Sequence, residues 1–122
     1  MKSCLIVDDS NIIRKVARRF VEDMHYVVSE AESAQEALDR CKVEPPDVII
    51  LDWNMPAMSA MEFLSALRVT ISGRRPYIIY CTTENDSGEI SRAISAGADT
   101  YMMKPFDRQM IITKFAEIPK AA

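Results

Sequence analysis

The sequence predicts an α/β fold in which five helices flank an open, doubly wound sheet of five parallel strands. Apolar runs without polar alternation, typical of strands covered on both faces, alternate five times with segments of helical apolar spacing. The connections are short, so parallel strands with right-handed crossovers are expected. Five units are too few for an eight-stranded barrel, which leaves an open sheet. With 122 residues, the chain is expected to form one domain over residues 1–122.

The first unit combines the strand Leu5–Val7 with a helix that Ser10 or Asn11 can cap. The apolar residues with helical spacing are expected to form the buried face of this helix; they are Ile12, Ile13, Val16, Phe20, Val21 and Met24. The basic residues are expected to form a solvated face, with docking of an acidic partner as the alternative; they are Arg14, Lys15, Arg18 and Arg19.

The other four units are located by the same signals. Strands are expected at Tyr26–Val28, Val48–Leu51, Tyr77–Cys81 and Thr100–Met103. Helices are expected over about residues 33–41, 59–71, 87–96 and 107–118. A capping box of Ser33 and Glu36 opens the first of these helices, and Gly97 closes the third.

Composition and charge exclude several classes of function. A net charge of −3 and an isoelectric point near 5.2 argue against nucleic-acid or membrane binding, which requires a basic surface. No run approaches the ~20 apolar residues of a membrane span, and the three glycines form no phosphate-binding loop. Cys4, Cys41 and Cys81 lack Cys-x-x-Cys spacing, so we expect buried, unreactive thiols in a reduced, cytoplasmic setting.

Polar residues gather where the predicted strands end. The first strand runs into Asp8 and Asp9, the third into Asp52, the fourth into Thr82 and the fifth into Lys104. Parallel strands bring these ends to one edge of the sheet, where open α/β folds bind ligands. Each residue alone has an ordinary explanation, as a helix cap, a turn residue or a surface lysine. Their coincidence at successive strand ends favours a functional site.

Three clustered carboxylates repel one another and call for a cation. Oxygen ligands suit Mg²⁺, whereas zinc would require His or Cys ligands that these strand ends do not offer, apart from Cys81. The metal and Lys104 can offset the charge of a phosphoryl group, to which the Thr82 hydroxyl can donate a hydrogen bond. A carboxylate can itself be the nucleophile and form an aspartyl phosphate. Asp52 is the candidate, because the paired acids Asp8 and Asp9 are better suited to holding metal.

The motifs around these residues resemble those of receiver domains in two-component response regulators over the full length of the chain. They are Asp8-Asp9-Ser10, Asp52-Trp53-Asn54-Met55-Pro56, Thr82-Thr83-Glu84 and Lys104-Pro105-Phe106. The spacing between Asp52, Thr82 and Lys104 also matches the spacing expected of receiver domains. The second motif is also similar to that of stand-alone chemotaxis regulators of the CheY type. The resemblance implies a flavodoxin-like sheet with strand order 2-1-3-4-5.

The resemblance implies a role for each residue of the acidic cluster. Asp52 would accept a phosphoryl group from a phosphohistidine on a sensor histidine kinase or a phosphotransfer protein. Asp9, Asp52 and the backbone carbonyl of Asn54 would bind Mg²⁺ directly, and Asp8 would act through a metal-bound water. Lys104 would pair with the phosphate, aimed by a cis peptide bond before the following proline.

Thr82 and Tyr101 would form the switch that the resemblance implies. Thr82 would follow the phosphoryl oxygen inward and Tyr101 would change rotamer, altering the face formed by the fourth helix, fifth strand and fifth helix. Strand alternation puts Tyr101 on the opposite side from Lys104 and favours a ring directed toward the helix over residues 87–96. An ordinary strand aromatic is the alternative. The output protein stays open; we expect a monomer, with dimerisation on phosphorylation undecided.

Two other functions share these residues. A phosphorelay carrier would pass the phosphoryl group to another histidine protein and would need no output face. A hydrolase with an aspartyl-phosphate intermediate is disfavoured, because such enzymes commonly carry an acid where this chain has Asn54. Arg74-Arg75 could bind a phosphorylated ligand such as a nucleotide, but a plain polar loop is favoured.

Ala60 departs from the receiver pattern, which usually has glycine at this position. If the backbone there requires a positive φ, alanine would be strained by about 1 kcal/mol. The departure bears on loop dynamics and phosphoryl lifetime, and leaves the acceptor chemistry unchanged.

Overall fold

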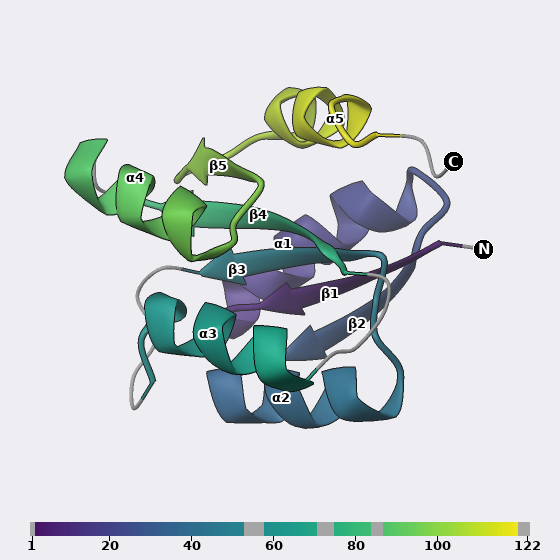
Figure 1. The fold of residues 1–122 in the computed structure, drawn as a ribbon. Coiled ribbons are helices and arrows are strands. Elements are labelled where there is room, and N and C mark those ends of the chain that lie inside the picture. Colours follow the sequence, from purple (N-terminus) through teal and green to yellow (C-terminus); the bar gives the residue numbers. More distant parts are fainter. Residues whose placement is uncertain (1, 53–57, 71–74, 84–86, 120–122) are drawn as a thin grey trace.

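The structure, a computed structural model, describes residues 2–52, 58–70, 75–83 and 87–119. Five parallel strands lie in the order β2-β1-β3-β4-β5 (Figure 1), which confirms the predicted fold class and strand order. The strands are β1 (Ser3–Val7), β2 (Val27–Ala31), β3 (Val48–Asp52), β4 (Tyr77–Thr82) and β5 (Thr100–Met103). The helices are α1 (Asn11–Glu22), α2 (Ala34–Val43), α3 (Ala60–Thr70), α4 (Ser87–Ala96) and α5 (Arg108–Ala116).

The side chains of each strand alternate between two helical layers. Leu5 and Val7 of β1 belong to a core shared with α2, α3 and α4, whereas Cys4 and Ile6 belong to a core shared with α1 and α5. Figure 1 shows α2 and α3 in front of the sheet and α1 behind it. Because both faces are buried, the strands read as continuous apolar runs.

The buried face of α1 matches the predicted one only in part: Val21 is buried as expected, and Phe20 and Met24 pack against the core. Its buried residues are Arg14, Ala17 and Val21, spaced three and four positions apart. Ile12 and Val16, which we expected in the core, are 75% and 43% exposed. A helix buries one stripe of limited width, and the prediction followed large apolar residues instead of the small Ala17. The predicted solvated basic face is therefore wrong for Arg14.

Strand pairing and backbone geometry determine where β2 and α1 begin and end, which the sequence pattern located only approximately. β2 starts at Val27 and continues to Ala31, because it pairs with the whole of β1. The helix α1 ends at Glu22, followed by a turn in which His25 has a φ of 67°. Gly97 follows α4 with a φ of 131°, in the region that favours glycine, as predicted for a helix end.

Serine side chains cap the first three helices. Ser10, not Asn11, caps α1, and Ser33 caps α2. At α3, Ser59 and Glu62 each accept a hydrogen bond from the backbone N–H of the other, at 3.1 and 3.2 Å, which is a complete capping box. Ala60 is the first residue of α3, so its backbone belongs to a right-handed helix and the strain of a positive φ does not arise.

Two expectations drawn from composition concern the state of the cysteines and the possibility of a membrane-spanning helix. All three cysteines are free and buried, as predicted. Burial raises the pKa of the Cys41 thiol to about 11 and that of Cys81 to about 12, so both remain protonated near neutral pH. Within the described ranges, each helix is too short or too polar to cross a bilayer.

Candidate functional site

The carboxyl ends of four neighbouring strands bring the predicted site residues together. β1 leads into Asp8 and Asp9, β3 ends at Asp52, β4 ends at Thr82, and Lys104 follows β5. One carboxylate oxygen from each of the three aspartates lies within 4.8 Å of the other two. A cluster of oxygen ligands this compact can hold a hard divalent cation.

The three acids differ in exposure. Asp8 and Asp52 are each 3% exposed, while Asp9 is open to solvent. Asp52 is the last residue of β3, which lies between β1 and β4, and it pairs with Cys81 of β4. Pairing with β4 therefore holds the backbone of Asp52, one residue beyond the last β1–β3 pair at Leu51. Two buried carboxylates this close repel each other strongly unless a cation lies between them.

Lys104 supplies such a cation. Its Nζ atom lies 2.5 Å from Oδ1 of Asp52 and 3.0 Å from Oδ2 of Asp8. Its backbone N–H donates to the carbonyl oxygen of Thr82 at 2.9 Å, and the peptide bond to Pro105 is cis, as expected. Burial by itself lowers the pKa of Lys104, but hydrogen bonds and charge attraction from Asp52 and Asp8 outweigh this and raise the pKa above its ordinary value.

Asp8 is held at its backbone and at both carboxylate oxygens. Its N–H donates to the carbonyl of Ala31 at 3.1 Å, and its Oδ1 accepts from the backbone N–H of Ser10 at 2.8 Å. Its own carbonyl accepts from NH1 of Arg14 at 2.6 Å. Sequence reasoning missed Arg14; the available signal was that it shares a helical stripe with small and apolar residues.

A family model decides the identity of the chain. The model of the response regulator receiver domain matches residues 4–116, which include the three aspartates, Thr82 and Lys104. The chain belongs to the response regulator receiver family.

The receiver is also similar to chemotaxis proteins over nearly its whole length. It is 31% identical over 117 residues to the chemotaxis protein CheY of Halobacterium salinarum, covering 96% of each chain. It is 35% identical over 116 residues to a CheY homolog of Campylobacter jejuni, covering 93% of this chain and 89% of that one. The solved chemotaxis response regulator CheY4 of Vibrio cholerae matches with a TM-score of 0.88 at 32% identity, covering 95% of this chain and 97% of that one. The receiver is thus CheY-like, a signalling switch rather than a catalytic enzyme.

The two proposed switch residues of the receiver differ in environment. Thr82 is 1% exposed and pairs with Met103 of β5. Tyr101 is 40% exposed, and Nζ of Lys114 on α5 lies 5.4 Å from the centroid of its ring. The contact described for this ring is thus with α5, whereas the sequence favoured a ring directed toward α4.

Part of the predicted site lies outside the described residues. The backbone carbonyl of Asn54, predicted as a metal ligand, falls in this group, as do Trp53 and Glu84. The role of Asn54 stays a prediction. Arg74 is also outside, whereas Arg75 pairs with Asp99 at 2.6 Å.

Three basic residues of α1 converge on Glu30 of β2. Oε1 of Glu30 lies 3.0 Å from Nε of Arg14, and Oε2 lies 2.9 Å from Nζ of Lys15 and 2.6 Å from NH1 of Arg18. Burial by itself raises the pKa of Glu30, but the three hydrogen bonds lower it to about 2. These basic side chains form an ion-pair network within the receiver in which Arg14 is buried, whereas Lys15 stays exposed, as predicted, and Arg18 partly exposed.

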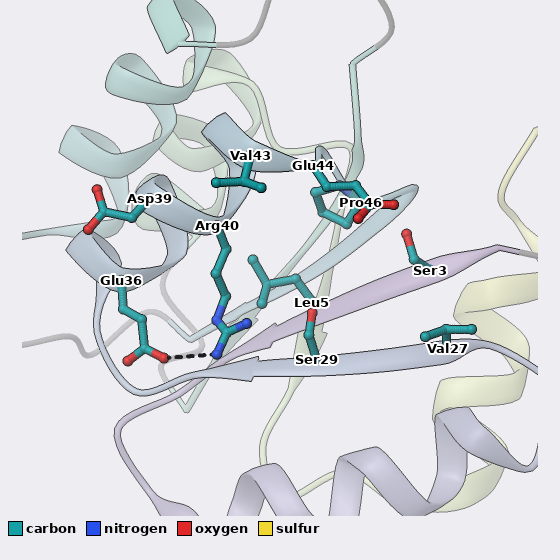
Figure 2. Close-up of a pocket in the computed structure, with 10 residues that line it drawn as sticks. All are labelled: Ser3, Leu5, Val27, Ser29, Glu36, Asp39, Arg40, Val43, Glu44 and Pro46. Carbon is teal, nitrogen blue, oxygen red and sulfur yellow. Dashed lines mark hydrogen bonds and ion pairs between the residues drawn. The ribbon is translucent and has the colours of Figure 1, made fainter.

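A pocket of about 580 Å³ lies between α2 and the strands β1 and β2 (Figure 2). Its lining residues are Ser3, Leu5, Val27, Ser29, Glu36, Asp39, Arg40, Val43, Glu44 and Pro46. Two of these residues, Arg40 and Glu36 of α2, form an ion pair at 3.4 Å. Neither a cluster aspartate nor Lys104 lines this pocket, so the pocket is separate from the candidate site at the strand ends.

Proposed function

We propose that this receiver is a phosphorylation-activated response regulator in which Asp52 accepts a phosphoryl group from a histidine kinase or a phosphotransfer protein. The observation that carries the proposal is the contact of Lys104 with Asp52 and Asp8, beside the exposed Asp9. Family membership supports a histidine kinase as the partner. Similarity to CheY proteins supports an output in chemotaxis.

Asp52 is proposed as the acceptor because it ends the central strand β3 and its Oδ1 lies 2.5 Å from Nζ of Lys104. In the transfer, an Asp52 oxygen forms a bond to phosphorus as the P–N bond to the donor histidine breaks, and the imidazole nitrogen keeps the electron pair. Lys104 then pairs with the phosphoryl oxygens, and the Thr82 hydroxyl donates a hydrogen bond to one of them.

The donor set fits Mg²⁺. The three carboxylates and the ammonium of Lys104 carry a net formal charge of −2, which a divalent cation neutralises. Asp9, Asp52 and the Asn54 carbonyl would bind the ion directly, and Asp8 through a water. When bound, Mg²⁺ offsets the negative charge that builds up on the transferring phosphoryl group.

The face formed by α4, β5 and α5 is proposed as the output surface. It exposes apolar groups that can contact a partner, since Ile94 of α4 is 42% exposed, Tyr101 of β5 40% and Ile112 of α5 40%. Thr82 lies buried at the end of the strand next to β5, so a movement of its hydroxyl toward a phosphoryl group would alter packing behind Tyr101.

Mapping of the phosphorylated residue tests the proposal. The receiver is incubated with acetyl phosphate and Mg²⁺, and the acyl phosphate is reduced with borohydride and located by mass spectrometry. Label is expected on Asp52 in the wild type and in Asp39→Asn, which alters an exposed acid of α2, and it should be lost in Asp52→Asn. Labelling of Asp52→Asn at the wild-type rate would overturn the assignment.

A further inference from the structure

Arg14 contacts the backbone of the acidic cluster, whereas Lys104 contacts its carboxylates. The Arg14 side chain is 10% exposed, and all three guanidinium nitrogens donate hydrogen bonds. NH1 donates to the Asp8 carbonyl at 2.6 Å, NH2 to Oδ1 of Asn11 at 3.2 Å, and Nε to Oε1 of Glu30 at 3.0 Å. A buried guanidinium with three directed bonds has one orientation, so it can fix the groups it contacts.

We propose that Arg14 is a positioning residue for the metal site: with Glu30, it holds the Asp8–Asp9 turn in the geometry that binds Mg²⁺. The inference rests on the proposed function, because it assigns a role within the same site. Arg14 itself would touch neither the metal nor the phosphoryl group.

The argument from geometry concerns the peptide unit that joins Asp8 to Asp9. The Asp8 carbonyl belongs to this unit, so holding it fixes the ψ torsion of Asp8 and with it the direction in which the chain continues to Asp9. The N–H of Asp8 is fixed on the sheet side by the carbonyl of Ala31 at 3.1 Å. The bond from Arg14 fixes the carbonyl on the other side of the residue. Supporting hydrogen bonds of this kind orient metal ligands, and their loss typically weakens metal binding by about 10–100-fold.

The positive charge of Arg14, taken alone, would have the opposite effect on Mg²⁺ affinity. A guanidinium near a metal site repels Mg²⁺, so removing it should tighten binding if charge were its main contribution. Glu30 reduces this repulsion, because its lowered pKa of about 2 keeps it ionised and paired with Arg14 at neutral pH. The sign of the change in Mg²⁺ affinity therefore distinguishes positioning from charge repulsion.

The test compares Arg14→Met with Arg18→Met. Each variant removes one ion pair to Glu30, but only Arg14 donates to the Asp8 carbonyl. Mg²⁺ affinity is measured by titration calorimetry, and the rate of Asp52 labelling by acetyl phosphate is measured over a range of Mg²⁺ concentrations. Arg14→Met should raise the Mg²⁺ Kd about tenfold or more, whereas Arg18→Met should stay within about twofold of wild type. Saturating Mg²⁺ should restore most of the labelling rate in Arg14→Met, because the acceptor is intact.

An unchanged or tighter Mg²⁺ Kd in folded Arg14→Met would overturn the inference. If that variant does not fold, Arg14→Lys decides, since a compact ammonium keeps the charge but lacks the three separate nitrogens that bond the carbonyl, Asn11 and Glu30. Its Kd should rise by at least about threefold, and a wild-type Kd would overturn the inference. Absence of Mg²⁺ binding by the wild type would instead refute the proposed function, so the two failures are distinguishable.

Discussion

Lys104 lies between two buried carboxylates, and its charge governs the electrostatics of the site. Burial disfavours the charged ammonium, but the contacts with Asp52 and Asp8 raise the pKa of Lys104 and keep it protonated at neutral pH. The same ammonium both lowers the repulsion between the acids and competes with a metal ion for them. Its removal should therefore affect metal binding and phosphoryl transfer in opposite directions.

We predict that Lys104→Met slows the labelling of Asp52 by acetyl phosphate about 10²-fold, because a charged donor to the phosphoryl oxygens is lost. Its Mg²⁺ Kd should stay the same or decrease, since the competing cation is gone. Single-turnover labelling and calorimetry measure the two effects, with Lys42→Met, an exposed lysine of α2, as the control. Labelling of Lys104→Met at the wild-type rate would remove Lys104 from the mechanism.

At the scale of elements, ion pairs to one carboxylate link α1 to the edge strand β2. Glu30 accepts from Arg14, Lys15 and Arg18, and its side chain is only 11% exposed. The pKa of Glu30 is lowered from 4.5 to about 2 in the folded state. A lowered pKa means that the stabilisation is present above pH 4.5 and is lost as the pH falls toward 2.

Glu30→Gln should therefore lower the free energy of unfolding by about 2 kcal/mol at pH 7, and the difference from wild type should shrink as the pH falls from 4.5 toward 2. Urea unfolding followed by circular dichroism at several pH values measures this. Glu22→Gln removes an exposed ion pair to Arg18 and should change stability by at most about 0.5 kcal/mol. A pH-independent difference for Glu30→Gln would contradict the assignment of the lowered pKa.

The end of β4 and the adjacent β5 contain the proposed switch. Thr82 is buried at the proposed phosphoryl site, whereas Tyr101 is partly exposed beside Lys114. Moving this ring inward would break the contact with the Lys114 ammonium and bury aromatic surface. A difference of a few kcal/mol in phosphate contacts is enough to shift such an equilibrium.

We expect Thr82→Ala and Tyr101→Ala to bind beryllofluoride, a phosphoryl mimic, yet to show much smaller amide shifts than wild type over residues 87–96. Two-dimensional NMR spectra with and without the mimic measure this. Thr113→Ala, an exposed residue of α5 with no part in the proposed relay, serves as the control. Full wild-type shifts in both switch variants would leave Asp52 as the acceptor and exclude this relay.

At the scale of the whole molecule, the packed sheet holds three acidic side chains close together at one edge. Both sheet faces are covered by helices, so moving the strand ends apart to relieve repulsion would disrupt two packed cores. A cation that binds the edge therefore stabilises the entire native state, because the unfolded chain does not hold these carboxylates together.

Mg²⁺ at 100 times its Kd should raise the free energy of unfolding by about 2.7 kcal/mol, and EDTA should reverse the effect. Asp9→Ala and Asp52→Ala should abolish most of the increase, while Asp8→Ala should reduce it less, because Asp8 is proposed to act through a water. Thermal unfolding with and without Mg²⁺ measures this, and Asp39→Asn is the matched control. Equal stabilisation in all four variants would show that the ion binds elsewhere.

Much of the fold and of the site could be predicted from the order of residues alone. Continuous apolar strands such as Val48–Leu51 exclude a sheet with a solvated face, and strict alternation with helices requires parallel pairing. Parallel pairing in turn brings Asp8, Asp9, Asp52 and Lys104 to one edge, whatever the packing details.

Only the tertiary structure decided which side of α1 is buried and what its basic residues do. Ile12 and Ala17 both fit a helical pattern, and the choice between them depends on the shape of the sheet surface that α1 packs against. The contacts of Arg14 with Asp8 and Glu30 join α1 to the turn after β1 and to β2, so helical spacing alone does not encode them. The order of residues was enough to predict the chemistry at the edge of the sheet, because hydrophobic periodicity and the residues that follow each strand are local features of the chain. The tertiary structure decided which side chains orient that chemistry, because burial and long-range hydrogen bonds exist only once the elements have packed.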